Sequence, residues 1–171
     1  MRRFTLLLAA GVAALACAGT AAAQHHDEPP VPWPIQVDEG HKVFLQAHAV
    51  GVQIYGCTAT GWSLVAPRAT LYDRHGKRIG SHFAGPTWQA KDGSSVKAQR
   101  VAGVPVAGTI DWLKLQATAT TPGRFGRVSF IQRINTTGGV APAASTCTAD
   151  TVGDQREIPY TADYRFFKEF R

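Results

Sequence analysis

Short segments rich in Val, Ile, Phe and Tyr, separated by glycine and proline, constrain the fold of this chain most. From residue 37 onward the turn residues recur roughly every 8–12 residues, the spacing expected of a sandwich or closed barrel. No amphipathic helical pattern longer than a turn or two interrupts them. The expected strands cover residues 42–49, 52–57, 62–65, 69–72, 78–83, 88–90, 95–101, 110–118, 127–135 and 160–167. The sequence therefore predicts an all-β antiparallel fold, either a β-sandwich or a small β-barrel.

Three of the connections between these strands have clear turn residues. Residues 73–77 open with Asp73 and place Gly76 where a left-handed residue is needed, which predicts a hairpin. Asp92-Gly93 predicts a second turn, and Thr121-Pro122-Gly123 a third. Residues 128–134 alternate with a period of two and a single polar exception, with Val128, Phe130, Gln132 and Ile134 on one face and Ser129, Ile131 and Arg133 on the other.

The segments 42–49 and 52–57 allow two arrangements. If they pair as a hairpin across Val50-Gly51, His48 faces Gln53 and Tyr55 joins them on one polar-aromatic face. Val50 is β-branched, and tight hairpin turns favour glycine or asparagine. A bulge at Gly51 within one long strand is the alternative.

The N-terminus has the features of an export signal. Arg2 and Arg3 precede an uncharged apolar run at 4–16, and small residues lead to Ala23. This pattern predicts a signal peptide at residues 1–23, cleaved after Ala23, and a periplasmic or secreted protein. A twin-arginine signal and lipidation at Cys17 are the weaker alternatives. The apolar run is too short to span a membrane, and no later segment is longer.

The predicted mature chain divides into a proline-rich leader, residues 24–36, and a single β domain, residues 37–171. Loss of Arg2 and Arg3 removes two of the charges that give the net +6, leaving +4. No run of basic residues remains, so we expect no nucleic-acid partner, although an anionic envelope polymer could be attracted.

Cysteine usage predicts one disulfide. Cys17 leaves with the signal, so that only Cys57 and Cys147 remain. Two cysteines in an oxidising compartment usually pair, and we expect this pair to do so.

Four segments resemble a known family. They are residues 48–57 (HAVGVQIYGC), residues 82–94 (HFAGPTWQAKDGS), residues 135–142 (NTTGGVAP) with Cys147, and residues 159–164 (PYTADY). In this order they resemble the family called domain of unknown function 3455, exported proteins of bacteria and fungi, over residues 40–167. The resemblance implies one exported domain and carries no activity with it.

Residues 82–94 form the first candidate site. His82 and Asp92 could act as acid and base beside a ligand stacked on Trp88. The structural alternative makes Asp92-Gly93 a turn, Trp88 a core residue and His82 a strand-end cap. The second candidate site is the group His48, Gln53 and Tyr55, which could line a cavity in a barrel and supply another acid–base pair, His48 and Tyr55.

Metal and hydrolase signatures are weak. The histidines lack zinc-type spacing, no G-x-S-x-G motif occurs, and we expect no cofactor. Cleavage after Ala23 would place His25 and His26 beside a free amine, a nitrogen set that suits Cu(II) or Ni(II).

The sequence therefore favours a non-enzymatic binding or envelope-associated module that recognises a small ligand or polymer through Trp88, Gln53 and Tyr55. A small acid–base enzyme and a purely structural extracellular protein are the alternatives. The lack of a paired-carboxylate, triad or metal motif is the reason for this order.

Overall fold

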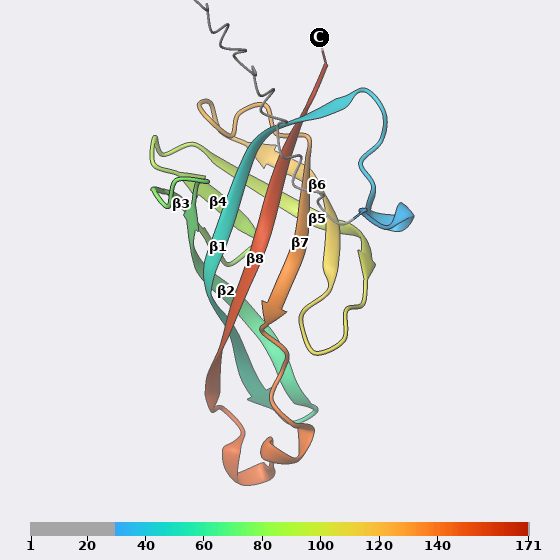
Figure 1. The fold of residues 1–171 in the computed structure, drawn as a ribbon. Helices are drawn as coiled ribbons and strands as arrows, with labels where there is room; N and C mark the ends of the chain where they lie inside the picture. Colours follow the sequence, from blue (N-terminus) through green and yellow to red (C-terminus); the bar gives the residue numbers. More distant parts are fainter. Residues whose placement is uncertain (1–29, 171) are drawn as a thin grey trace, which may run out of the picture. The chain divides into compact units, whose positions relative to one another are not determined.

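The computed structural model describes residues 30–170, and eight antiparallel strands dominate them (Figure 1). Each strand pairs with its neighbours in the sequence, and the last pairs with the first, so that the sheet closes. The strands are β1 (His41–Thr58), β2 (Gly61–Tyr72), β3 (Arg78–Phe83), β4 (Thr87–Ala90), β5 (Ser95–Val104), β6 (Trp112–Thr120), β7 (Phe130–Gly138) and β8 (Gln155–Glu169). The all-β antiparallel fold is confirmed, and of the two expected architectures the closed barrel is the one observed.

β1 is one strand of 18 residues. Val50 and Gly51 lie in its middle, paired with β2 on one side and β8 on the other. Of the two arrangements, the hairpin across these residues is wrong and the single long strand is confirmed, but the bulge expected at Gly51 is not observed. A Cβ atom on Gly51 would collide with the backbone of Arg68 and Ala69 in β2, so glycine lets these two strands approach closely.

The register of β1 shifts elsewhere than at Gly51. Its pairing with β8 shifts between Val43 and Leu45, and its pairing with β2 shifts between Ile54 and Tyr55. Such shifts bend a strand and increase its twist, which helps an 18-residue strand to follow the curved wall.

β2 also forms one strand where two were expected, and it passes through Pro67. β3 is short and pairs with β2 only from Ala69 to Tyr72. The first half of β2 therefore has β1 as a partner and no described strand on its other side. A proline is tolerated there because a sheet position without a partner needs no N–H donor.

Two of the predicted turns have the expected chemistry. Asp73 Oδ1 accepts hydrogen bonds from the backbone N–H groups of His75 (2.9 Å) and Lys77 (3.0 Å), and Gly76 has φ +73°. Gly93 has φ +85° in the turn that joins β4 to β5. Both turns predicted from these residues are confirmed.

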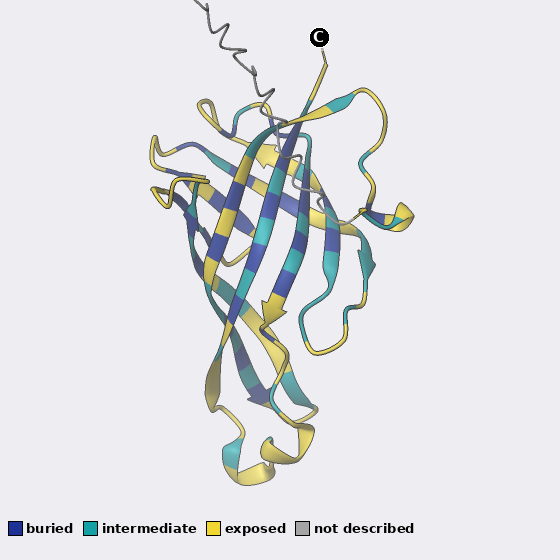
Figure 2. Ribbon diagram, in the orientation of Figure 1, coloured by how far each residue is buried: buried dark blue, intermediate teal, exposed yellow. Residues whose placement is uncertain are grey.

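Alternate residues of each strand face the interior and form the core (Figure 2). Its largest members are aromatic: Trp88, Phe125, Tyr164 and Phe166 are each at most 1% exposed. Phe125 and Phe166 stack with ring centroids 4.7 Å apart. This cluster fills one part of the barrel.

Both faces of β7 are covered. Ile131 belongs to the core, whereas Gln132, on the opposite face, is buried and donates a hydrogen bond to Ile35 O at 2.6 Å. Ile35 ends the short 3-10 helix η1 (Trp33–Ile35), which lies in the segment expected to be a leader. The last residues of that segment therefore pack against the barrel wall, within the compact unit Val31–Arg171.

The Cys57–Cys147 disulfide is present, with Cα atoms 5.4 Å apart. It joins the end of β1 to a loop that contains the 3-10 helices η2 (Ala144–Thr146) and η3 (Ala149–Thr151). The loop is also held by hydrogen bonds from Cys57 N to Asp154 O and from Trp62 Nε1 to Thr146 Oγ1. Because disulfides persist in oxidising compartments, this bond fits a location outside the cytoplasm.

Within residues 30–170, no helix has the length and apolar character needed to cross a membrane. The predicted cleavage site after Ala23 and the alternative lipidation site Cys17 lie outside the described residues.

Candidate functional site

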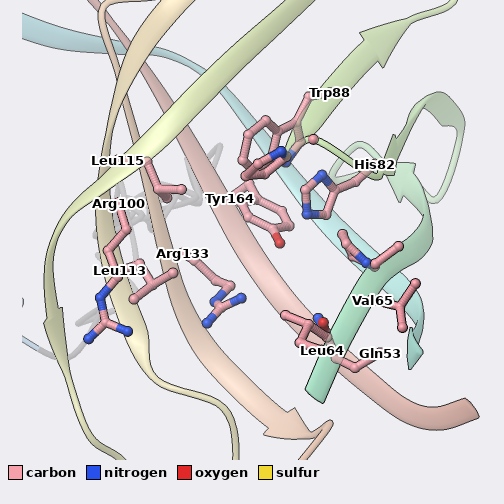
Figure 3. Close-up of a pocket in the computed structure, with 14 residues that line it drawn as sticks. Gln53, Leu64, Val65, His82, Trp88, Arg100, Leu113, Leu115, Arg133 and Tyr164 are labelled. Atoms are coloured by element: carbon pink, nitrogen blue, oxygen red, sulfur yellow. The ribbon is translucent and has the colours of Figure 1, made fainter. Parts of the chain in front are cut away.

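A cavity of about 320 Å³ lies inside the barrel (Figure 3). We call it the barrel cavity, and every strand contributes to its lining, in chain order Gln53, Leu64, His82, Trp88, Arg100, Leu113, Arg133 and Tyr164. Leu64 and Val65 at its edge are each 55% exposed, so the cavity reaches solvent beside the first half of β2. The gap left by the short strand β3 is therefore the entrance.

Three aromatic rings form one wall of the cavity. The imidazole of His82 stacks on the indole of Trp88, with centroids 4.1 Å apart and planes 10° from parallel. Tyr164 meets both rings edge-on, at 5.4 Å from each. The strands set this arrangement, because His82 and Trp88 are directly paired across β3 and β4.

His82 is held in one protonation state. Its Nδ1 lies 2.9 Å from Thr87 O, and since a carbonyl only accepts, Nδ1 carries the proton and donates. Burial lowers the pKa of the imidazole to about 3; the hydrogen bond to Thr87 opposes this effect and the charge of Arg133 adds to it. His82 is thus a neutral ring at physiological pH.

Arg133 brings a positive charge into the barrel. Its Nε and Nη2 atoms donate to Asp111 O at 3.0 and 2.8 Å. The carboxylate of Asp111 instead pairs with Arg100 Nη2, at 3.0 Å. The described residues that line the cavity include both arginines and neither an aspartate nor a glutamate.

Two polar atoms of the lining make no hydrogen bond within residues 30–170. They are Gln53 Nε2 and Trp88 Nε1, both on side chains no more than 2% exposed. Buried polar atoms in folded proteins are nearly always paired with protein or water. These atoms therefore have no partner among the described residues and are open to a partner that enters the cavity.

The structure separates the first expected acid–base pair. His82 lines the barrel cavity, whereas Asp92 sits in the turn after β4, where its carboxylate accepts from the N–H and hydroxyl of Ser94 and from Arg124 N. These three hydrogen bonds also hold the pKa of Asp92 below its usual value. The pair His82 and Asp92 is not brought together.

The second expected acid–base pair, His48 and Tyr55, is also separated, because the two side chains lie on opposite faces of β1. His48 points outward, where its Nδ1 forms a hydrogen bond with Asp163 Oδ1 at 2.7 Å, and Asp163 also accepts from Asn135 Nδ2. Tyr55, an odd number of residues along the same strand, is buried and donates to Gly139 O at 2.7 Å.

The expected ligand-binding residues fare differently from these pairs. Trp88 and Gln53 meet in the barrel cavity, joined there by His82. Tyr55 is buried in the same barrel but satisfied by Gly139, and it is absent from the cavity lining.

Arg133 and Tyr164 are the site residues that the sequence analysis missed. A signal for Arg133 was present, because the alternation of 128–134 places it on the same face as Ile131. That face proves to be the interior one, and arginine is rarely found on the interior face of a strand. Tyr164 gave no comparable signal, since tyrosines are ordinary in strands.

Among residues 30–170 no group of three or more His, Cys, Asp or Glu side chains could hold a metal ion. His25 and His26, proposed as ligands of Cu(II) or Ni(II), lie outside the described residues.

Comparison with known proteins places the chain in a family. The model of the family described as "Protein of unknown function (DUF3455)" matches residues 38–168. Neither a curated protein nor a solved structure matches the chain. The match covers most of the sequence, and the chain therefore belongs to this family of unknown function, DUF3455.

Proposed function

We propose that this protein is a non-enzymatic binding module, which holds one small molecule in the barrel cavity. The observation that carries the proposal is the pair of buried, unpartnered polar atoms, Gln53 Nε2 and Trp88 Nε1, that line an otherwise mainly apolar cavity. A cavity of about 320 Å³ is at the lower end of the size range of small-molecule sites, which are apolar and carry a few convergent polar groups. The interior of a barrel is a common place for such sites.

The chemistry of the lining favours binding over acid–base catalysis. His82 is neutral, buried and engaged by Thr87, and no carboxylate lines the cavity within the described chain. A general acid–base mechanism needs a group that exchanges protons near the working pH. The lining offers shape, stacking and hydrogen-bond donors instead.

The enclosed position of the site favours a small ligand over an envelope polymer. The opening beside β2 admits a compact molecule, whereas a polymer binds along an extended groove or surface. We further propose that the protein acts in the periplasm or outside the cell, on the grounds of its signal-like N-terminus and its disulfide.

The test is a fluorescence titration with the uncharged apolar dye N-phenylnaphthylamine. The wild-type protein should bind one equivalent with enhanced dye emission. Leu113→Trp, which adds volume to the cavity wall, should weaken the affinity about tenfold or more. Leu113→Met, a volume-conserving change, should leave it within about threefold.

Thermal melts of both variants should confirm that they fold. Absence of dye binding to the wild type, or equal binding by folded Leu113→Trp, would refute the cavity as a binding site.

A further inference from the structure

We propose that the ligand of the barrel cavity is an organic monoanion, whose single acidic group binds at Arg133 while its apolar body fills the rest of the cavity. This inference rests on the proposed function and names the chemical class of the ligand. It starts from the charges around Asp111. Two guanidinium groups, those of Arg100 and Arg133, contact this residue, which carries one carboxylate.

The single carboxylate goes to Arg100. Among residues 30–170, the acceptors of Arg133 are neutral: the backbone carbonyl of Asp111 and the hydroxyl of Tyr164. Within the described part of the chain, this partly buried guanidinium therefore has no carboxylate as a counter-ion, and charges in protein interiors are normally paired. One unit of positive charge therefore remains for a ligand of charge −1.

The positions of the side chains agree with this assignment. Figure 3 shows the guanidinium of Arg133 and the hydroxyl of Tyr164 pointing into the space between the two groups of lining side chains. The guanidinium has five N–H donors, of which two N–H groups donate to Asp111 O, and it also interacts with the Tyr164 hydroxyl. An acidic group on the ligand can accept from the remaining N–H groups of Arg133 and from Tyr164 without displacing Asp111.

The unpartnered polar atoms share one property. Gln53 Nε2 and Trp88 Nε1 are donors only. The Tyr164 hydroxyl, which interacts with Tyr160 and Arg133, also has a proton to donate. A site in which every unsatisfied atom can donate is complementary to a ligand rich in acceptors. A carboxylate or sulfonate, with oxygens that only accept, is such a group.

The field inside the barrel has the same sign. Burial raises the pKa values of Tyr55, Tyr160 and Tyr164 and lowers that of His82, while the positive charge of Arg133 acts to lower all four. Arg133 is the charged side chain that acts on the whole group. With His82 neutral, an entering anion meets one uncompensated cation.

The other residues that line the cavity indicate the chemistry of the rest of the ligand. Leu113, Leu115 and Pro86 are apolar, and His82 and Trp88 present ring surfaces. An apolar or aromatic body attached to one acidic group satisfies both parts of the site.

The experiment compares two dyes that differ mainly in charge, anilinonaphthalene sulfonate and N-phenylnaphthylamine. Arg133→Met should weaken the affinity for the sulfonate about tenfold or more while changing that for the neutral dye by less than about threefold. Arg133→Lys, which keeps the charge, should recover most of the sulfonate affinity.

Arg156→Met is the matched control, because it removes a positive charge from an exposed arginine outside the cavity. It should leave the ratio of the two affinities unchanged. A second measurement needs no variant: at neutral pH and moderate salt, octanoate should displace N-phenylnaphthylamine from the wild type about tenfold better than octanol does.

The outcomes separate the two proposals. If both dyes bind but Arg133→Met leaves their ratio unchanged, or if octanol competes as well as octanoate, the monoanion is wrong and the binding cavity stands. If the neutral dye fails to bind the wild type, the binding cavity itself is wrong and the monoanion falls with it.

Discussion

His82 lies flat against Trp88, 4.1 Å between centroids, and each ring covers one face of the other. The two residues are also neighbours across β3 and β4, the two shortest strands. These short strands form few backbone pairs, and the ring pair adds a buried side-chain contact between them.

Trp88→Ala should destabilise the protein by about 3–5 kcal/mol, because the indole is almost fully buried against His82, Tyr164 and Phe166. Equilibrium denaturation in urea measures this. The matched control is Trp33→Ala, whose side chain is 82% exposed and whose loss should change the stability by less than about 0.5 kcal/mol. Similar midpoints for the two variants would contradict the buried role of Trp88.

The stability of the protein should fall as the pH decreases from about 6.5 toward 4. The unfolded His82 has a pKa near 6.5, while burial lowers the folded pKa to about 3. Between these values the unfolded state binds a proton that the folded state does not, so acid favours unfolding.

His82→Gln should flatten this pH dependence, since glutamine does not titrate and can still donate to Thr87. His48→Gln, at an exposed site, should retain it. The lowered pKa values of Asp38, Asp73 and Asp92 add a separate loss of stability below about pH 3.8. A wild-type stability that stays constant from pH 6.5 to 4 would contradict the neutral, buried imidazole.

Asp92→Ala should lower the melting temperature without changing dye binding. The Asp92 carboxylate joins the turn after β4 to Ser94 and to Arg124 N, and all three hydrogen bonds are lost with it. Because the residue lies away from the barrel cavity, the affinity for N-phenylnaphthylamine should remain within about twofold. A large loss of affinity in a folded variant would restore the link between Asp92 and His82.

Replacing both cysteines, Cys57→Ser with Cys147→Ser, should destabilise the protein by up to about 4–5 kcal/mol, through the greater freedom of the unfolded chain. Denaturation curves of the variant and of the oxidised wild type measure the difference. Peptide mapping without reduction should find the two cysteine segments linked. Two thiols that alkylate freely in the native protein would contradict the bond.

Local chemistry could be predicted from the sequence. The Asp73 turn was correct because its hydrogen bonds join residues only a few positions apart. The same holds for the turn at Gly93. In both cases the residue types themselves determine the conformation.

Long-range pairing could not be predicted in this way. Whether Val50-Gly51 turns or continues depends on β2 and β8, and Gly51 is glycine because of the backbone of Arg68. The same limit applies to β7, where the adjacent residues Gln132 and Arg133 lie on opposite faces. Gln132 is buried on the outer face because the segment that ends at Ile35 packs there, and the local sequence does not predict this contact. The candidate site was half predicted for this reason: Trp88, Gln53 and His82 meet, and Arg133 joins them from a face that the pattern alone did not identify as interior.

The position of the disulfide has a consequence for the rate of folding. Every pairing in the barrel joins consecutive strands except the seam between β1 and β8, which joins the two ends of the sheet. Cys57 lies beside this seam, and its partner is 90 residues away along the chain. Once the bond has formed, the path from Gly56 to its partner Gln155 shortens to about ten residues, and closing short loops carries a smaller entropic barrier. In the oxidised chain the pairing of β1 with β8 should therefore close a loop as short as that of a local hairpin. The oxidised chain should form its barrel faster than the reduced chain.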